Sequence, residues 1–236
     1  MSETSMPEVD ALFFDVFGTL VDWRSSIARD APAVIGREID GFAFADAWRA
    51  EYQVGMEGVR QGQRGYVRLD VLHLENLRRI LPRFGLEDLD EETLGRLNLL
   101  WHRLSGWTDV QFGLSRLRRR YRLAPCSNGN IGLMVDLARH NNFIWDAILG
   151  AEIARDYKPK PSVYLAAADA LGLPPERCMM VAAHSYDLKS AAACGLRTAH
   201  VARPDEYGPG TGEAEPTVPV DHAAASLTDL ATRLGT

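Results

Sequence analysis

The stretch FFDVFGTLVDW, residues 13–23, places an acid at the end of an apolar run. The run ALFF, residues 11–14, is short and apolar and stops at Asp15, which is typical of a buried strand. A glycine and a threonine follow within four positions, and the residue two places after the acid is Phe17 rather than a second acid. Because parallel sheets bind ligands at the carboxyl ends of their strands, Asp15 is a candidate functional residue.

Short apolar runs of the same kind recur along the second half of the chain, with helical patterns between them. The runs occupy residues 122–126, 147–149, 178–183 and 197–202, and the helical patterns occupy residues 131–140, 162–171, 188–194 and 227–234. Strands that alternate with helices of this length predict right-handed βαβ units and a parallel sheet covered by helices on both faces.

Residues 24–107 have a different pattern. They carry long amphipathic stretches at 44–60, 66–81 and 91–104 and no convincing strand. We therefore predict an α/β protein with a Rossmann-like parallel sheet core, residues 1–23 plus 108–236, and an inserted helical cap domain, residues 24–107. The stretch 203–220, rich in Pro, Gly and Glu, is expected to be an ordered loop or a flexible segment before the last helix.

Composition limits the classes of partner. The 236 residues carry a net charge of −6, which argues against nucleic-acid or anionic-membrane binding. No apolar run approaches the roughly 18 residues of a membrane span, and the polar first ten residues predict no signal peptide. The three cysteines fit reduced thiols in a cytoplasmic protein. RLRRRYR, residues 116–122, is expected to be a solvated helix end, because no aromatic platform accompanies it.

Polar residues follow the predicted strands in four separate places. These are Asp15, Ser127 with Asn128, Lys158 in the segment DYKPKPSVY, and the segment from His184 to Asp187. The predicted fold gathers them along one edge of the sheet. Structural alternatives remain open at this point: helix caps for Asp15, Thr19 and Asp187, surface roles for Lys158 and Arg49, a structural role for His184 and core packing for Tyr164.

These segments resemble the four motifs of the haloacid dehalogenase superfamily. The matching residues are DVFGTL at 15–20, SNG at 127–129, YKP at 157–159 and the final acid Asp187, and WR at 48–49 is similar to the family's cap. Within the superfamily, the chain most resembles the type II L-2-haloacid dehalogenases. The resemblance implies a Rossmann-like core, a helical cap, and an active site between them.

Two positions distinguish this chain from the superfamily's phosphatases. Those enzymes carry Asp-x-Asp, where the second acid protonates the leaving group, and Phe17 stands at that place here. If Asp187 matches the last acid of their Gly-Asp-x-x-x-Asp pattern, the first acid falls at Ala183. A phosphate with its metal is then poorly served, whereas a halide departs as a stable anion and needs no general acid. We therefore predict no metal and no cofactor.

The resemblance implies a mechanism in two steps. Asp15 attacks the halogen-bearing carbon, displaces halide and forms an ester, and water then hydrolyses that ester. Lys158 would keep Asp15 ionised, Asp187 would orient Lys158 and the water, and Thr19 would hydrogen-bond Asp15.

The resemblance also implies the residues that bind substrate. Ser127 and the backbone amides after Asp15, those of Val16 and Phe17, would hold the substrate carboxylate. Arg49 and Asn128 would cradle the departing halide, and Tyr164 matches a family active-site tyrosine.

One departure concerns the water. Type II members have Ser-Ser-Asn before the fourth-motif acid, and this chain has Ala182-Ala183-His184. His184 would position the water, act as its base, or contact halide.

The sequence thus predicts hydrolysis of short 2-haloalkanoic acids, such as haloacetates and L-2-halopropionate, by water at a cytoplasmic enzyme. Its cap and Trp-rich helices are compatible with a homodimer. Two alternatives remain: a superfamily phosphatase or phosphonatase, and a non-catalytic protein that binds small carboxylates.

Overall fold

The protein is described by a computed structural model that covers residues 8–236. Residues 1–7 lie outside the described part, and with them most of the stretch from which the absence of a signal peptide was predicted. Within residues 8–236, no helix is long and apolar enough to cross a membrane.

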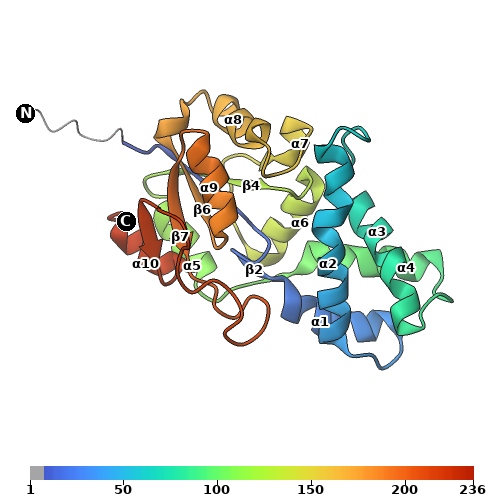
Figure 1. The fold of residues 1–236 in the computed structure, drawn as a ribbon. Helices are drawn as coiled ribbons and strands as arrows, with labels where there is room; N and C mark the ends of the chain where they lie inside the picture. The colour runs from blue at the N-terminus through green and yellow to red at the C-terminus, as the bar shows by residue number, and fades with distance from the viewer. Residues whose placement is uncertain (1–7) are drawn as a thin grey trace, which may run out of the picture.

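A six-stranded parallel sheet forms the centre of the fold, in the order β5-β4-β1-β6-β7-β8 (Figure 1). The strand β1 lies between β4 and β6, and Phe14 pairs in register with Pro125 and Val181. The sheet therefore places the residue after Phe14, which is Asp15, at the middle of its carboxyl edge. The strands are β1 (Ala11–Phe14), β4 (Arg122–Ser127), β5 (Leu149–Gly150), β6 (Cys178–Ala182), β7 (Arg197–Val201) and β8 (His222–Ala224).

The predicted fold class is confirmed, with two differences among the strands of this sheet. The run at 147–149 forms a strand only from Leu149, and β8 was not predicted. The strand β8 has only three residues, HAA, which is too short for an alternating pattern to stand out.

Helices cover both faces of the sheet (Figure 1). Alternate residues of β1 face opposite sides: Leu12 and Phe14 pack in one apolar cluster, and Ala11 and Phe13 pack in another. The first cluster includes side chains of α5 (Val110–Leu117), α6 (Ile131–Asn141) and α10 (Leu227–Arg233); the second includes side chains of α8 (Pro161–Ala170) and α9 (Ser185–Ala193). The short helices α7 (Ala151–Ala154) and η3 (Pro175–Arg177) complete this part of the chain.

The helix α9 begins three residues before its predicted start. Its first turn contains Ser185 and Asp187, and these polar residues hide the apolar pattern that begins at Leu188. The arginine-rich stretch behaves as predicted, because α5 ends at Leu117 and the three arginines at 118–120 are exposed before β4.

The segment between β1 and β4 is helical and begins and ends at one small antiparallel ribbon. The strands β2 (Val21–Asp22) and β3 (Ser105–Gly106) pair side by side, so the chain leaves and re-enters the core at one place. The strand β3 lies inside the stretch predicted to lack strands; it has two residues and no readable alternation. The helices between are α1 (Trp23–Ile35), α2 (Gly41–Arg60), α3 (Leu69–Ile80), η1 (Leu81–Phe84), α4 (Glu91–Asn98) and η2 (Leu99–Arg103).

Aspartates start three of these helices. Asp22, Asp40 and Asp90 are the N-caps of α1, α2 and α4, and each side chain accepts a hydrogen bond from a backbone N–H in the first turn. Such caps stabilise a helix by about 1 kcal/mol each. Figure 1 shows these helices grouped to one side of the sheet. The division into domains at residues 23 and 107 stays a prediction.

Candidate active site

Four segments meet at the carboxyl edge of the sheet, as we predicted from the polar residues that follow the strands. Asp15 follows β1, Ser127 ends β4, and His184 follows β6. Lys158 comes from the loop between α7 and α8, and its side chain is buried beside Asp15. The predicted residues therefore lie together although they are far apart in the chain.

Both oxygens of the Asp15 carboxylate are held. The Lys158 Nζ lies 3.3 Å from Oδ1, while Oδ2 accepts a hydrogen bond from the Thr19 hydroxyl at 2.8 Å and lies 3.1 Å from His184 Nδ1. Burial alone would raise the pKa of Asp15, but the Lys158 charge and the contacts with His184 and Thr19 outweigh burial and lower the pKa. Asp15 is therefore a carboxylate at neutral pH, which is the form that can act as a nucleophile.

Asp187 and Tyr164 form a hydrogen-bonded chain that ends on the ammonium group of Lys158. The Lys158 Nζ donates to Asp187 Oδ2 at 2.7 Å, and the Tyr164 hydroxyl donates to Asp187 Oδ1. Burial would lower the pKa of Lys158, but Asp187 and Asp15 outweigh burial and raise the pKa, so the ammonium stays charged. Burial raises the pKa of Asp187, and the charge of Asp15 adds to that rise, against the opposing effect of Lys158. A carboxylate with a raised pKa is suited to take a proton from water.

The alternative that Asp15, Thr19 and Asp187 are helix caps is wrong. The N-cap of α1 is Asp22 rather than Thr19, and the N-cap of α9 is His184 rather than Asp187. No helix begins after Asp15, where the chain forms a tight turn before β2. Thr19 instead joins two motifs, because its oxygen also accepts a hydrogen bond from the Ala183 backbone N–H at 2.9 Å.

Ser127 and Asn128 contact the loops around the site. The Asn128 Oδ1 accepts a hydrogen bond from the Lys158 backbone N–H at 2.8 Å, and the Ser127 hydroxyl oxygen accepts one from the Gly129 N–H at 3.1 Å. These contacts fix the loop that carries Lys158 relative to β4. Val16 belongs to the turn that follows Asp15, where its carbonyl accepts a hydrogen bond from the Leu20 backbone N–H. Contact of these groups with substrate stays a prediction.

Arg49 lies on α2 beside the aromatic rings of Trp23 and Tyr52. Its guanidinium carbon lies 4.0 Å from the Tyr52 ring centroid and 5.3 Å from that of Trp23. Its Nη1 is buried and has no hydrogen-bond partner among residues 8–236. A cleft here is lined by Trp23, Asp46, Arg49, Ala50, Tyr52, Gln53, Tyr186 and Tyr207. Arg49 thus has a buried N–H group that can donate a hydrogen bond to an anion.

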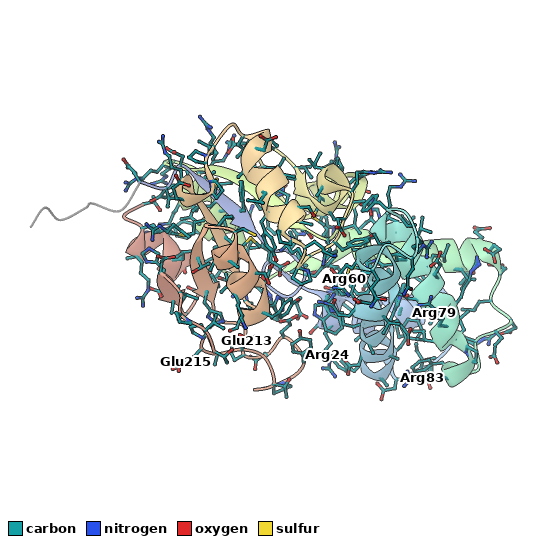
Figure 2. All side chains as sticks on the ribbon, turned by 45° about the horizontal axis from the view of Figure 1, so that its top comes forward. Arg24, Arg60, Arg79, Arg83, Glu213 and Glu215 are labelled. Carbon is teal, nitrogen blue, oxygen red and sulfur yellow. The ribbon has the colours of Figure 1, made fainter. Side chains whose placement is uncertain are left out.

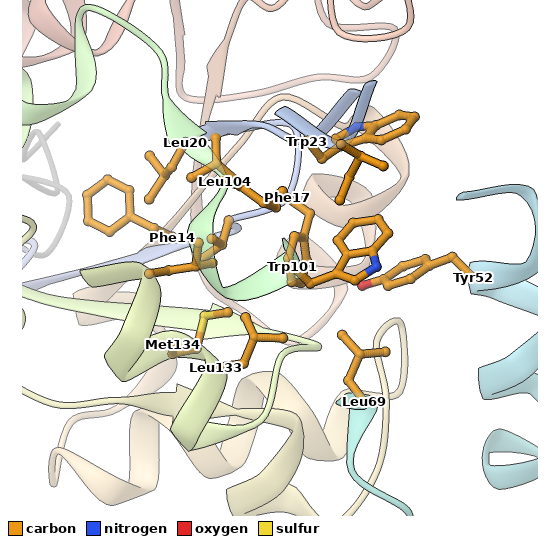
Figure 3. Packing of buried hydrophobic residues seen from close by; sticks show 14 of the residues in the cluster. Phe14, Phe17, Leu20, Trp23, Tyr52, Leu69, Trp101, Leu104, Leu133 and Met134 are labelled. Atoms are coloured by element: carbon orange, nitrogen blue, oxygen red, sulfur yellow. The ribbon is translucent and has the colours of Figure 1, made fainter. Parts of the chain in front are cut away.

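Phe17 packs among aromatic side chains of the helical segment between β1 and β4. Its ring is buried and meets Tyr52, His73 and Trp101 edge-on, with centroid distances of 6.2, 6.2 and 5.8 Å. These partners come from α2, α3 and η2, and Figure 3 shows Phe17 between the core residues Phe14 and Leu20 and the rings of Trp101 and Tyr52. The position that holds a second acid in the phosphatases therefore holds an anchor between the two parts of the chain.

Glu206 was missed by the sequence motifs. It is buried, its Oε2 lies 2.8 Å from His184 Nε2, and its Oε1 accepts a hydrogen bond from Trp23 Nε1 at 3.1 Å. Glu206 lies five residues beyond the end of β7, so the strand-end rule applied to the run 197–202 points to this loop but not to this residue. Gly18 makes room for this carboxylate, because a Cβ there would lie 2.0 Å from Glu206 Oε1, and its φ of +85° also favours glycine.

The residues around Asp15 do not fit a magnesium ion. Two cationic side chains, Lys158 and His184, contact its oxygens. Across residues 8–236, no group of three or more His, Cys, Asp or Glu side chains has an arrangement that could hold a metal ion. Phe17 and Ala183 supply no ligand oxygen from their side chains.

Residues 9–195 match the family model for haloacid dehalogenase-like hydrolases. The chain belongs to the haloacid dehalogenase superfamily. A solved L-2-haloacid dehalogenase is 46% identical to it, with a TM-score of 0.91, over 96% of this chain and 100% of that one. A solved defluorinating L-2-haloacid dehalogenase is 44% identical, with a TM-score of 0.93, over 97% of this chain and 96% of that one.

A curated relative, (S)-2-haloacid dehalogenase 4A from Burkholderia cepacia, is 29% identical over 226 residues. The match covers 93% of this chain and 92% of the relative. The resemblance to L-2-haloacid dehalogenases inferred from the motifs is thus confirmed.

Proposed function

We propose that this protein is a hydrolase of carbon–halide bonds that converts short 2-haloalkanoic acids, such as haloacetates and L-2-halopropionate, to 2-hydroxy acids. The observation that carries the proposal is the buried Asp15 carboxylate, which Lys158 keeps ionised, with Phe17 at the position of the phosphatases' proton donor. Names of the similar proteins, the (S)- and L-2-haloacid dehalogenases, support the same reaction.

The first step is displacement of halide. Of the two Asp15 oxygens, Oδ2 is engaged by Thr19 and His184, and Oδ1 has the longer contact with Lys158. Oδ1 is therefore the attacking atom: it forms a bond to C2 of the substrate from the rear while the carbon–halide bond breaks, which inverts that carbon. The buried Arg49 Nη1, with Asn128, receives the halide anion where its charge develops.

The second step is hydrolysis of the Asp15 ester. Asp187 takes a proton from water, and the hydroxide oxygen bonds to Cγ of Asp15 while Oδ2 becomes negative. The Cγ–Oδ1 bond then breaks, and Oδ1 leaves with the product after taking a proton from Lys158. Transfer of a proton from Asp187 to Lys158 across their 2.7 Å contact, together with loss to solvent of the water's second proton from the new oxygen of Asp15, restores the resting state.

The remaining expectations belong to the same proposal. Preference for the L enantiomer, a cytoplasmic location and a homodimer are its finer parts, with Ser127 and the amides of Val16 and Phe17 holding the substrate carboxylate. The phosphatase alternative is not favoured, because the described site offers a phenyl ring where that chemistry needs an acid. A carboxylate-binding protein without catalysis has no need of a lysine that keeps Asp15 ionised.

The test is halide release from chloroacetate, both 2-chloropropionate enantiomers and fluoroacetate, in the presence of EDTA. The control is p-nitrophenyl phosphate with magnesium. We expect halide release without metal, and none from Asp15→Asn, which keeps the size of Asp15 and one acceptor oxygen but is a poor nucleophile. Phosphate release without halide release would refute the proposal.

A further inference from the structure

A continuous hydrogen-bonded chain leads from the nucleophile into the core. It runs from Asp15 Oδ2 to His184 Nδ1 at 3.1 Å, and from His184 Nε2 to Glu206 Oε2 at 2.8 Å. His184 and Glu206 are 3% and 1% exposed, so water does not screen these contacts. His184 stands where type II relatives have an asparagine, and Glu206 lies outside all four motifs.

The geometry fixes the protonation state of His184. A neutral imidazole has one N–H donor and one acceptor nitrogen, and only an imidazolium donates from both nitrogens. Each ring nitrogen of His184 faces a carboxylate oxygen, which can only accept. Burial would lower the pKa of His184, but the hydrogen bonds to Asp15 and Glu206 outweigh burial and raise the pKa to about 10. The ring of Tyr186 stacks on the imidazole at 5.5 Å and brings no charge at neutral pH.

We propose that Glu206 is a positioning residue that holds His184 as an imidazolium with Nδ1–H directed at Asp15 Oδ2, so that His184 and Thr19 form an oxyanion hole for hydrolysis of the Asp15 ester. This inference rests on the proposed function. In the tetrahedral intermediate the negative charge is on Oδ2, the oxygen that both donors already contact. A charged donor makes a hydrogen bond roughly twice as strong as a neutral amide does.

Glu206 matters most after the ester has formed. In the resting enzyme, two carboxylates contact His184. Formation of the ester neutralises Asp15, and the contact with Glu206 then holds the proton on the imidazole. Without that contact, the imidazole would lose its charge in the state that water attacks.

The surroundings hold Glu206 in one place. The Trp23 indole N–H binds its second oxygen, and the absence of a Cβ at Gly18 lets the carboxylate approach the turn after Asp15. Its loop is joined to the same turn by Arg203, whose Nε donates to the Thr19 carbonyl at 2.8 Å. Such a fixed second contact is what a ring needs to keep one orientation through a reaction.

The experiment compares Glu206→Gln with wild type in single-turnover reactions with L-2-chloropropionate. Halide release reports the first step, and mass spectrometry of the Asp15 peptide reports the ester. We expect a halide burst at the wild-type rate, followed by ester hydrolysis slowed by about 10²-fold, the usual effect of losing an oxyanion donor. The ester therefore accumulates. Ester hydrolysis in Glu206→Gln should also speed up as the pH is lowered, because protonation of His184 restores the donor, and Glu206→Asp should recover part of the rate.

A matched control is Glu213→Gln. Glu213 lies in the same loop (Figure 2), and it accepts hydrogen bonds from Ser185 instead of His184. We expect this variant to keep the wild-type ratio of the two rates.

Three outcomes would overturn the inference or its basis. Equal slowing of both steps in Glu206→Gln would make Glu206 a structural residue. A His184 ring that is neutral at pH 8 in wild type, seen in ¹⁵N NMR spectra, would overturn the inference without any variant. Absence of halide release from wild type itself would instead refute the proposed function.

Discussion

The buried imidazolium makes the stability of this protein depend on pH in a specific range. Replacement of His184 by Gln removes the titrating group and keeps a polar side chain of similar size. The pKa of His184 is raised from its ordinary value of 6.5 to about 10. A difference of 3.5 units at about 1.36 kcal/mol per unit gives a stabilisation of about 5 kcal/mol from this charge.

The sign follows from the direction of the shift. Because folding raises the pKa, the stabilisation is fully present below pH 6.5 and is lost as the pH rises through the folded value near 10. The difference in free energy of unfolding between wild type and His184→Gln should therefore fall by about 1.4 kcal/mol per pH unit between pH 7 and pH 10.

Urea unfolding at half-unit pH intervals measures this difference directly. Titrations of tyrosines and lysines elsewhere occur in both proteins and cancel in the comparison. A difference that stays constant from pH 6 to pH 10 would mean that His184 is neutral in the folded protein. The interpretation of its two carboxylate contacts would then be wrong.

Three further predictions follow from single contacts. Lys158→Met should raise the pKa of Asp15 by about 1–3 units, which leaves Asp15 ionised at neutral pH, and should slow turnover because Oδ1 of the ester then lacks its proton donor; a variant with more than half the wild-type turnover would contradict the role of Lys158. Phe17→Ala should lower the free energy of unfolding by about 3–5 kcal/mol, whereas Phe17→Leu should cost less, and urea unfolding that finds the two equal would count against the anchor between cap and core. Tyr164→Phe removes a hydrogen bond to a charged Asp187 and should lower the free energy of unfolding by about 1.5–3 kcal/mol. An unchanged free energy of unfolding in urea would contradict this contribution of Tyr164.

The sequence was most informative where the pattern is local. Short apolar runs that end in polar residues predicted β1, β4, β6 and β7 and the edge where Asp15, Ser127 and His184 meet. The same rule works because parallel strands all end on one side of a sheet.

Features that depend on long-range packing were not readable. Glu206 reaches His184 only through the course of the loop after β7, and Phe17 meets partners that lie 35 to 84 positions further along the chain. The short strands β3 and β8 have too few residues to form a period.

The helical segment between β1 and β4 also contacts Lys158 through the backbone. Arg60, in the last turn of α2, donates to the Lys158 carbonyl at 3.0 Å, and Figure 2 places Arg60 between cap and core, with Arg79 and Arg83 further out on the cap. Movement of α2 away from the core would therefore release the peptide that carries Lys158 as well as withdraw Arg49 and uncover Phe17. The helix that lines the cleft with Arg49 is thus the same helix that holds the Lys158 peptide, so the geometry of the two is set together.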